Sequence, residues 1–158
     1  MIATLLVLLL SGCEVCGPET TDESAFCPLS TCAETCTDVE AAIACCVAEG
    51  GRGLEEWDAA SLVESCTGAE CDPAAYLSVD AARCVAQVHG LSSGVATCAA
   101  DFMYIPGGPQ WYVNNVYRLD CGTPERPASG SGLSRSIHAI TGELLSEGYT
   151  SFDGECPE

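Results

Sequence analysis

Cysteine offers this chain the most chemistry, because thirteen of its 158 residues are cysteines. Cys32 and Cys36 are one helical turn apart and Cys45 and Cys46 are adjacent, and both spacings can support thiol–disulfide exchange. A reactive pair requires nearby cations or a helix N-terminus to activate the thiol, but this chain is strongly acidic. We therefore expect structural disulfides, which form in an oxidising compartment.

The first cysteine, Cys13, has a different expected role. Residues 2–10 are almost wholly apolar, a run too short to span a bilayer but of the right length for a signal-peptide core. The segment LSGC that follows resembles the bacterial lipobox. This resemblance implies that residues 1–12 are a signal peptide and that Cys13 is acylated, which anchors the mature protein in membrane lipid. One departure from the usual pattern is that no Lys or Arg precedes the apolar run.

Export would place the protein on the extracytoplasmic side of the bacterial cell envelope. Glu14, rather than Asp, follows the lipobox cysteine, which favours the outer membrane. The cysteines other than Cys13 can pair as disulfides, in a connectivity that their spacing leaves open. These candidates are Cys16, Cys27, Cys32, Cys36, Cys45, Cys46, Cys66, Cys71, Cys84, Cys98, Cys121 and Cys156.

The charge balance argues against nucleic-acid partners. The chain has 23 acidic residues, five arginines and no lysine, with a formal net charge of -18. Such a surface repels phosphate backbones and anionic lipid headgroups. It either favours basic partners or serves only as a solvated surface. The sequence has no P-loop, dinucleotide fingerprint, HExxH motif or haem-attachment motif, so we expect no cofactor, no metal and no catalytic residue.

Ser92 lies in GLSSG, which matches the nucleophile elbow of serine hydrolases. That elbow requires a turn from strand into helix, whereas here a helix comes first and a strand follows. The acidic segment EEWD at 55–58 lacks the spacing of a calcium loop, so we expect a solvated first helical turn. His89 should end a helix, and strand alternation places His138 on the outer face of a sheet.

The first half of the chain divides into a tether and a helical segment. Residues 13–26 are polar and acidic and predict a lipid-anchored flexible tether. Residues 27–72 predict a cysteine-rich helical segment, in which a capping box with Thr37 as N-cap begins a helix that stops at Gly50-Gly51. A second helix over 54–66 would complete a disulfide-stapled helical hairpin.

Residues 73–158 predict an α+β domain with one helix packed on a three- to four-stranded antiparallel sheet. Ser78 is the expected N-cap of a helix that ends at Gly90 and presents a stripe formed by Ala81, Cys84, Val85 and Val88. Strands are expected over 95–105, 111–120 and 133–140, with a turn at 107–109, a flexible loop over 122–132 and a turn at 141–142. On the strand over 111–120, alternation places on one face Trp111, Val113, Tyr117 and Leu119, with Asn115 as a polar exception.

Three segments of this domain resemble the PepSY-type module of exported bacterial proteins and peptidase propeptides. SVDAARCVA at 78–86 is similar to the helix of that module, WYV to its central W-x-V strand, and IHAITGE to its last-strand signature, I-D-A-x-T-G-E. The strand residues that carry the match are Trp111, Val113, Ile137, Ala139, Thr141, Gly142 and Glu143. The likeness covers residues 74–150 and departs from the pattern at His138, where the module has Asp. We further expect two disulfides that the common module lacks, Cys84–Cys98 and Cys121–Cys156.

The resemblance implies a fold and an association with binding or inhibiting peptidases. Our leading interpretation is a non-enzymatic, membrane-anchored lipoprotein that binds a protein or peptide, with the outer sheet face and the loop over 122–132 as the binding surface. A small extracytoplasmic thiol–disulfide or hydrolytic enzyme is the main alternative. A purely structural envelope protein is the third possibility.

Overall fold

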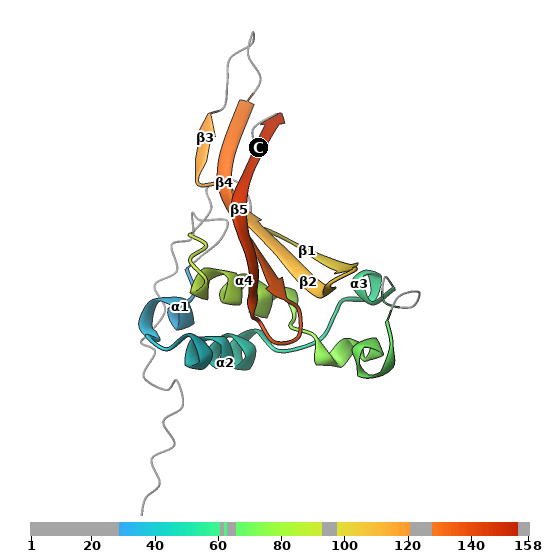
Figure 1. Cartoon of the computed structure of the whole chain (residues 1–158). Coiled ribbons are helices and arrows are strands. Elements are labelled where there is room, and N and C mark those ends of the chain that lie inside the picture. Colours follow the sequence, from blue (N-terminus) through green and yellow to red (C-terminus); the bar gives the residue numbers. More distant parts are fainter. Residues whose placement is uncertain (1–28, 61, 63–65, 93–97, 121–127, 155–158) are drawn as a thin grey trace, which may run out of the picture.

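The computed structural model describes residues 29–60, 62, 66–92, 98–120 and 128–154. The expected α+β class is confirmed: helices pack on one antiparallel sheet (Figure 1). The α-helices are α1 (Thr31–Thr35), α2 (Val39–Gly50), α3 (Glu56–Ala60) and α4 (Val79–Val88), and the 3-10 turns are η1 (Gly68–Cys71) and η2 (Pro73–Ala75). The strands are β1 (Cys98–Ile105), β2 (Gly108–Asn115), β3 (Arg118–Asp120), β4 (Ala128–His138) and β5 (Leu144–Gly154).

The long strand β4 organises the sheet. Along one side it pairs first with β3 and then with β2, whose other side carries β1, and along its opposite side it pairs with β5 over its whole length. The ends of these strands extend beyond the helices (Figure 1). We call this extension the distal arm, and it comprises β3, residues 128–133 of β4 and residues 149–154 of β5.

Helix α4 packs on β1, β2 and β4 and lies between the sheet and α2 (Figure 1). The core between helix and sheet contains Val85 and Ala86 of α4 and Trp111, Val113 and Ile137 of the sheet, all almost fully buried. The indole N–H of Trp111 donates to the Leu77 carbonyl at 3.1 Å, so the strand also fixes the start of the helix. This arrangement confirms the expected packing of one helix on the sheet.

Helices α2 and α4 approach each other closely. A Cβ on Gly50 would lie 2.4 Å from the Ala81 nitrogen, so only glycine fits at this contact. The Ser78 hydroxyl donates to the Gly50 carbonyl at 2.6 Å, and the Cys46–Cys84 disulfide bonds the two helices covalently. One hydrophobic cluster therefore contains residues from both sides of position 72, where the sequence suggested a boundary.

The helix ends agree with the sequence in most respects. Ser78 caps α4 by accepting from the Ala81 N–H, and α2 stops at Gly51, whose φ is +80°, as expected. The expected capping box at Thr37 is wrong: Asp38 is the N-cap, and its carboxylate accepts from the Glu40 N–H at 2.9 Å. Asp is as good an N-cap as Thr, so a shift by one position costs the helix nothing.

The helical hairpin expected within residues 27–72 does not form. In the described residues, α3 covers only Glu56–Ala60 of the helix expected over 54–66, and α2 packs mainly on α4. Two glycines explain the change, because Gly51 and Gly53 both have positive φ values and carry the chain away from α2 in an extended path. Arg52, between them, forms an isolated antiparallel bridge with Leu77.

Three expectations about the strands are wrong in detail. The hairpin between β1 and β2 turns at residues 106–107, so Pro109 is a buried strand residue and not part of the turn. The strand expected over 111–120 is two strands, and the inward face changes between them: Val116 is buried and Tyr117 exposed. Residues 128–132 of the expected flexible loop belong to β4.

The signal peptide, the lipid anchor Cys13 and the tether, which are predicted within residues 1–28, lie outside the described residues, as do Cys16 and Cys27. None of the helices in the described part of the chain has the length and apolar character that crossing a membrane would require.

Candidate functional site: an acidic groove beside the β4–β5 turn

A groove of about 600 Å³ opens between the start of α2, the end of α4 and the turn that joins β4 to β5. Its apolar lining comes from Val39, Ile43 and Leu144. Carboxylates contribute the charge, and the residues that supply them are Asp38, Glu40 and Glu143; His89 and Thr141 complete the lining. The groove thus combines an apolar floor with an acidic rim and can accept an amphipathic cationic group.

The β4–β5 turn forms one wall of the groove, and Gly142 allows it to pack there. Its φ is +75°, a conformation that side chains rarely adopt. A Cβ at this position would lie 3.2 Å from both Ile43 of α2 and Val85 of α4. The positive φ therefore favours glycine at this position, and a side chain would in addition force Ile43 and Val85 to shift by a few tenths of an ångström.

His138 holds the same turn from inside. Its Nδ1 accepts from the N–H groups of Ile140 and Thr141, both at 3.3 Å. A carboxylate oxygen could accept the same two bonds, so Asp could hold the turn at this position as His138 does. The side chain is half-buried, and its neighbours Ile137 and Ala139 are fully buried on the core face, as strand alternation predicted.

The third wall is the C-terminal end of α4, which two side chains fix. His89 is the C-cap of α4, at the helix end as expected, and its Nε2 lies 2.9 Å from the Gly142 carbonyl oxygen. Arg135 of β4 is buried and donates to the carbonyls of His89 at 2.7 Å and Gly90 at 3.3 Å. These bonds satisfy carbonyls that a helix end leaves open, and a cation is favourable at that end of the dipole.

Arg135 and Asn115 are structural residues that the sequence interpretation did not identify. Asn115 was noted only as a polar exception, yet it is fully buried at the end of β2. Its Nδ2 donates to the Ser92 carbonyl, and its Oδ1 accepts from the Leu133 N–H at 2.8 Å. A polar residue in phase with buried apolar ones was the available signal for such a role.

Within the described residues, six of the cysteines bond one another in three disulfides. Cys32 bonds Cys45, Cys46 bonds Cys84, and Cys66 bonds Cys71. The adjacent Cys45 and Cys46 therefore have different partners, and both are buried.

The expected Cys84–Cys98 staple is wrong, because Cys84 pairs with α2 instead; Cys98 is itself disulfide-bonded. Cys36 is half-buried and packs against the core, and Cys121 and Cys156 lie outside the described residues. The sulfurs of Cys32, Cys46 and Cys84 lie within 4.8 Å of one another, which is a metal-like spacing. In disulfides they are not thiolates, and the thiolate is the form that ligates metals.

Ser92 does not have the surroundings of an activated nucleophile in the described part of the chain. Its Oγ accepts from the Asn115 side-chain amide at 3.2 Å, and an amide cannot take the hydroxyl proton. Ser92 follows the end of α4, as the order of elements predicted. The residues that complete the motif, 93 and 94, lie outside the description.

The acidic segment at 55–58 is only partly solvated. Glu55 and Glu56 are exposed, whereas Asp58 is buried, which corrects the expectation for that residue. Burial, together with the carboxylates of Glu55 and Asp101, raises the pKa of Asp58. Trp57 is 64% exposed, and its indole N–H donates to Glu55 at 3.0 Å.

A smaller cavity of about 500 Å³ lies beside the Cys66–Cys71 disulfide, where Ala59, Leu62 and Pro73 contribute to an uncharged lining. It adjoins residues 61 and 63–65, which are not described. The acidic groove is the better candidate because described residues line it on three sides and it has both charge and apolar surface.

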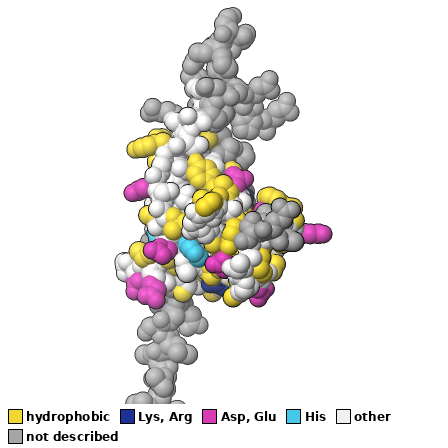
Figure 2. Space-filling model, turned by 45° about the vertical axis from the view of Figure 1, so that its right-hand side comes forward, with side chains coloured by type: hydrophobic (Ala, Val, Ile, Leu, Met, Phe, Trp, Pro, Cys, Tyr) yellow, Lys and Arg dark blue, Asp and Glu magenta, His cyan; other side chains and the backbone are white. Residues whose placement is uncertain are grey.

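The outer sheet face was the expected binding surface, and β2 contributes polar and aromatic side chains to it. Figure 2 shows hydrophobic side chains gathered in the middle of one face of the molecule, with a histidine next to them and acidic side chains nearer the margins. On β2, Tyr112 and Asn114 alternate with the core residues and are half-buried. The described residues of the expected loop, 128–132, are strand.

The residues that carry the family likeness fall into two groups. Trp111, Val113, Ile137 and Ala139 are buried core residues, and Thr141, Gly142 and Glu143 form the turn beside the groove. The Thr141 hydroxyl accepts from the Glu143 N–H at 3.3 Å, which orients the turn. No protein family, curated protein or solved structure matches this chain.

Proposed function

We propose that the chain is a non-enzymatic binding module, anchored by an acylated Cys13 in the bacterial cell envelope, that captures basic peptide segments in the acidic groove. The observation that carries this proposal is the groove itself: a concave apolar surface with carboxylates on two separate walls. A peptide with alternating basic and apolar residues has the matching chemistry, because its apolar side chains can reach Ile43 and Leu144 while its cations remain near the rim.

The charge of the whole chain supports the same class of partner. A net charge of -18 attracts cations from a distance and raises the rate of encounter with basic segments. No arginine is among the described residues that line the groove. Arg52 donates to the Ala75 and Ile140 carbonyls, and Arg135 donates to the His89 carbonyl and pairs with Glu147 at 3.4 Å. A basic segment of a peptidase or of another envelope protein would fit the lining of the groove and would also be attracted by the negative electrostatic potential of the chain.

The test uses the full-length, oxidised chain in detergent and a fluorescein-labelled hexapeptide that alternates leucine and arginine. We expect saturable binding by fluorescence anisotropy, and no binding of the matching peptide with glutamate in place of arginine. Glu143→Lys should weaken binding by about fivefold or more, which is about 1 kcal/mol for one rim charge pair.

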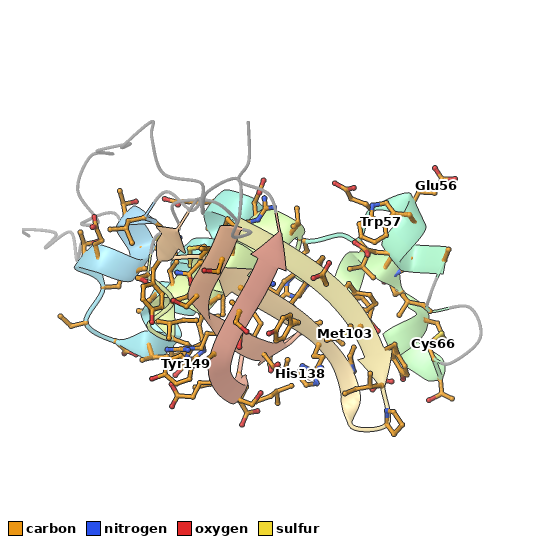
Figure 3. All side chains as sticks on the ribbon, turned by 90° about the horizontal axis from the view of Figure 1, so that it is seen from above. Glu56, Trp57, Cys66, Met103, His138 and Tyr149 are labelled. Carbon is orange, nitrogen blue, oxygen red and sulfur yellow. A yellow bond between two sulfur atoms is a disulfide. The ribbon has the colours of Figure 1, made fainter. Side chains whose placement is uncertain are left out.

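The matched control is Glu56→Lys, which makes the same charge change on α3. Figure 3 shows Glu56 on the opposite side of the molecule from Tyr149 of β5. If Glu143→Lys and Glu56→Lys weaken binding equally, the groove is not the site and only the overall charge matters. If the arginine peptide does not bind, the proposed function is wrong.

A further inference from the structure

The outer edge of β5 begins where the groove ends. Leu144 lines the groove and is also the first residue of β5, which then continues for ten more residues to Gly154. In the described part of the chain, β5 pairs with β4 alone, so its other edge is open. A chain that leaves the groove in this direction meets a row of backbone groups without a strand partner.

Two backbone hydrogen bonds at the end of β4 identify which residues present those groups. The Ala139 N–H donates to Pro109 on the β2 side, and the His138 N–H donates to Glu143 on the β5 side. Strand residues alternate in direction, so the even-numbered residues of β4 turn their backbone toward β5 and the odd-numbered ones away from it. Residues that pair with odd-numbered positions therefore direct their own backbone groups outward, and these are Glu147, Tyr149 and Ser151, opposite Arg135, Leu133 and Ser131.

The side chains along this edge leave it accessible. Tyr149 is 83% exposed and Leu145 is 44% exposed, so two large apolar groups are available to a partner. The register between β4 and β5 shifts at Leu145, which is the extra residue of a β-bulge. This bulge lies where the groove meets the edge of β5. β5 has no lysine or proline, which are residues that natural proteins commonly use to block edge strands.

We infer that a basic partner binds as an added β-strand along β5, after its first residues have entered the groove. This inference rests on the proposed function and specifies the partner's conformation: an extended segment, not a helix. The negative charge of the chain determines which kind of strand can bind along this edge. Glu143 lies at the start of the edge, and Glu147, which pairs with the buried Arg135 at 3.4 Å, lies further along it. A second copy of the chain would bring another net charge of -18 to this edge, whereas a basic strand is attracted.

The test uses dodecapeptides in which the arginine–leucine hexapeptide is preceded or followed by six residues of alternating threonine and arginine. Two N-methylated versions are compared, one with methyl groups on the odd-numbered residues and one with them on the even-numbered residues. Only one set of amides can face β5, so one version should lose about tenfold in affinity and the other should not. Equal affinities of the two versions would overturn the added strand while leaving groove binding intact.

A protein variant gives an independent measurement. Tyr149→Pro removes one outward N–H at a position where an edge strand tolerates proline, and Tyr149→Ala is the matched control for loss of the side chain. We expect Tyr149→Pro to weaken binding of the dodecapeptide more than Tyr149→Ala, and to leave binding of the hexapeptide unchanged. If instead light scattering detects a dimer that Tyr149→Pro abolishes, the occupant is a second copy, and the inference is wrong.

Discussion

The helix-backed half of the sheet and the distal arm share β4 and β5 but are held by different interactions. In the helix-backed half, Trp111, Val113 and Ile137 are buried against α4, which is in turn bonded to α2 by Cys46–Cys84. In the distal arm, Tyr149 is 83% exposed, and Tyr117, which directly precedes β3, is 41% exposed. Burial of apolar surface therefore stabilises the first region, and strand pairing is the main interaction in the second.

The difference shows which residues a strand needs when no helix covers it. Residues 128–132 of β4 are small, and Gly132 is in contact with the backbone where β2 gives way to β3: a Cβ there would lie 1.5 Å from the Asn115 carbonyl oxygen. The Tyr117 N–H donates to the Ser131 carbonyl at 3.2 Å, so β3 joins the same strand immediately beyond this contact. Small residues let β4 pass the junction between its two partners.

The largest expected effect is on the helix-backed half. Replacing Cys46 and Cys84 with alanine opens a link that closes a separation of 38 residues, and we expect a loss of about 4 kcal/mol in unfolding free energy. Urea unfolding under non-reducing conditions measures this loss. The matched control is the double alanine variant of Cys66 and Cys71, whose separation is 5 residues and whose expected loss is about 2 kcal/mol. Equal losses would mean that loop closure is not what these disulfides contribute.

The sequence predicted the helix-backed half better than the arm, for a physical reason. Ser78 and Gly90 are local signals, and the apolar alternation of Trp111, Val113 and Ile137 follows from their burial on one face. In contrast, the GSGL run at 130–133 has the composition of a loop, and only its two neighbouring strands make it a strand. Residue composition reflects burial, and the described residues of β4 in the arm are mostly half-buried rather than part of the core.

The candidate site was predictable only in part. The TGE segment at 141–143 was identified through a family likeness, and it forms one wall of the groove. The other walls come from the start of α2 and the end of α4, which are far apart in the sequence. Ile43 and His89 meet that turn only because α2 packs on α4, and the expected hairpin of α2 with a later helix would have separated them.

An intermediate effect is expected at the junction of the two regions. Asn115→Ala removes the acceptor for the Leu133 N–H and the donor to the Ser92 carbonyl, so two partly buried hydrogen bonds to the backbone are lost. We expect a loss of about 2 kcal/mol, with hydrogen exchange faster in the distal arm than in α4. Asn114→Ala is the control, because Asn114 lies on the opposite face of β2. If exchange accelerates equally in both regions, the arm does not unfold separately and the comparison of the two regions fails.

The smallest expected effect concerns the turn that carries the groove at the other end of β4. His138→Ala removes the acceptor of the Ile140 and Thr141 N–H groups, which are near enough to solvent to find water, so we expect a loss of about 1 kcal/mol. His138→Asp restores an acceptor at the same place and should recover most of this loss in thermal unfolding. Because Glu143 follows the same turn, His138→Ala should also weaken binding of the arginine–leucine hexapeptide, and His138→Asp should bind it at least as well as the native chain. A His138→Asp protein as unstable as His138→Ala would show that the ring packs against its neighbours rather than holding the turn through Nδ1.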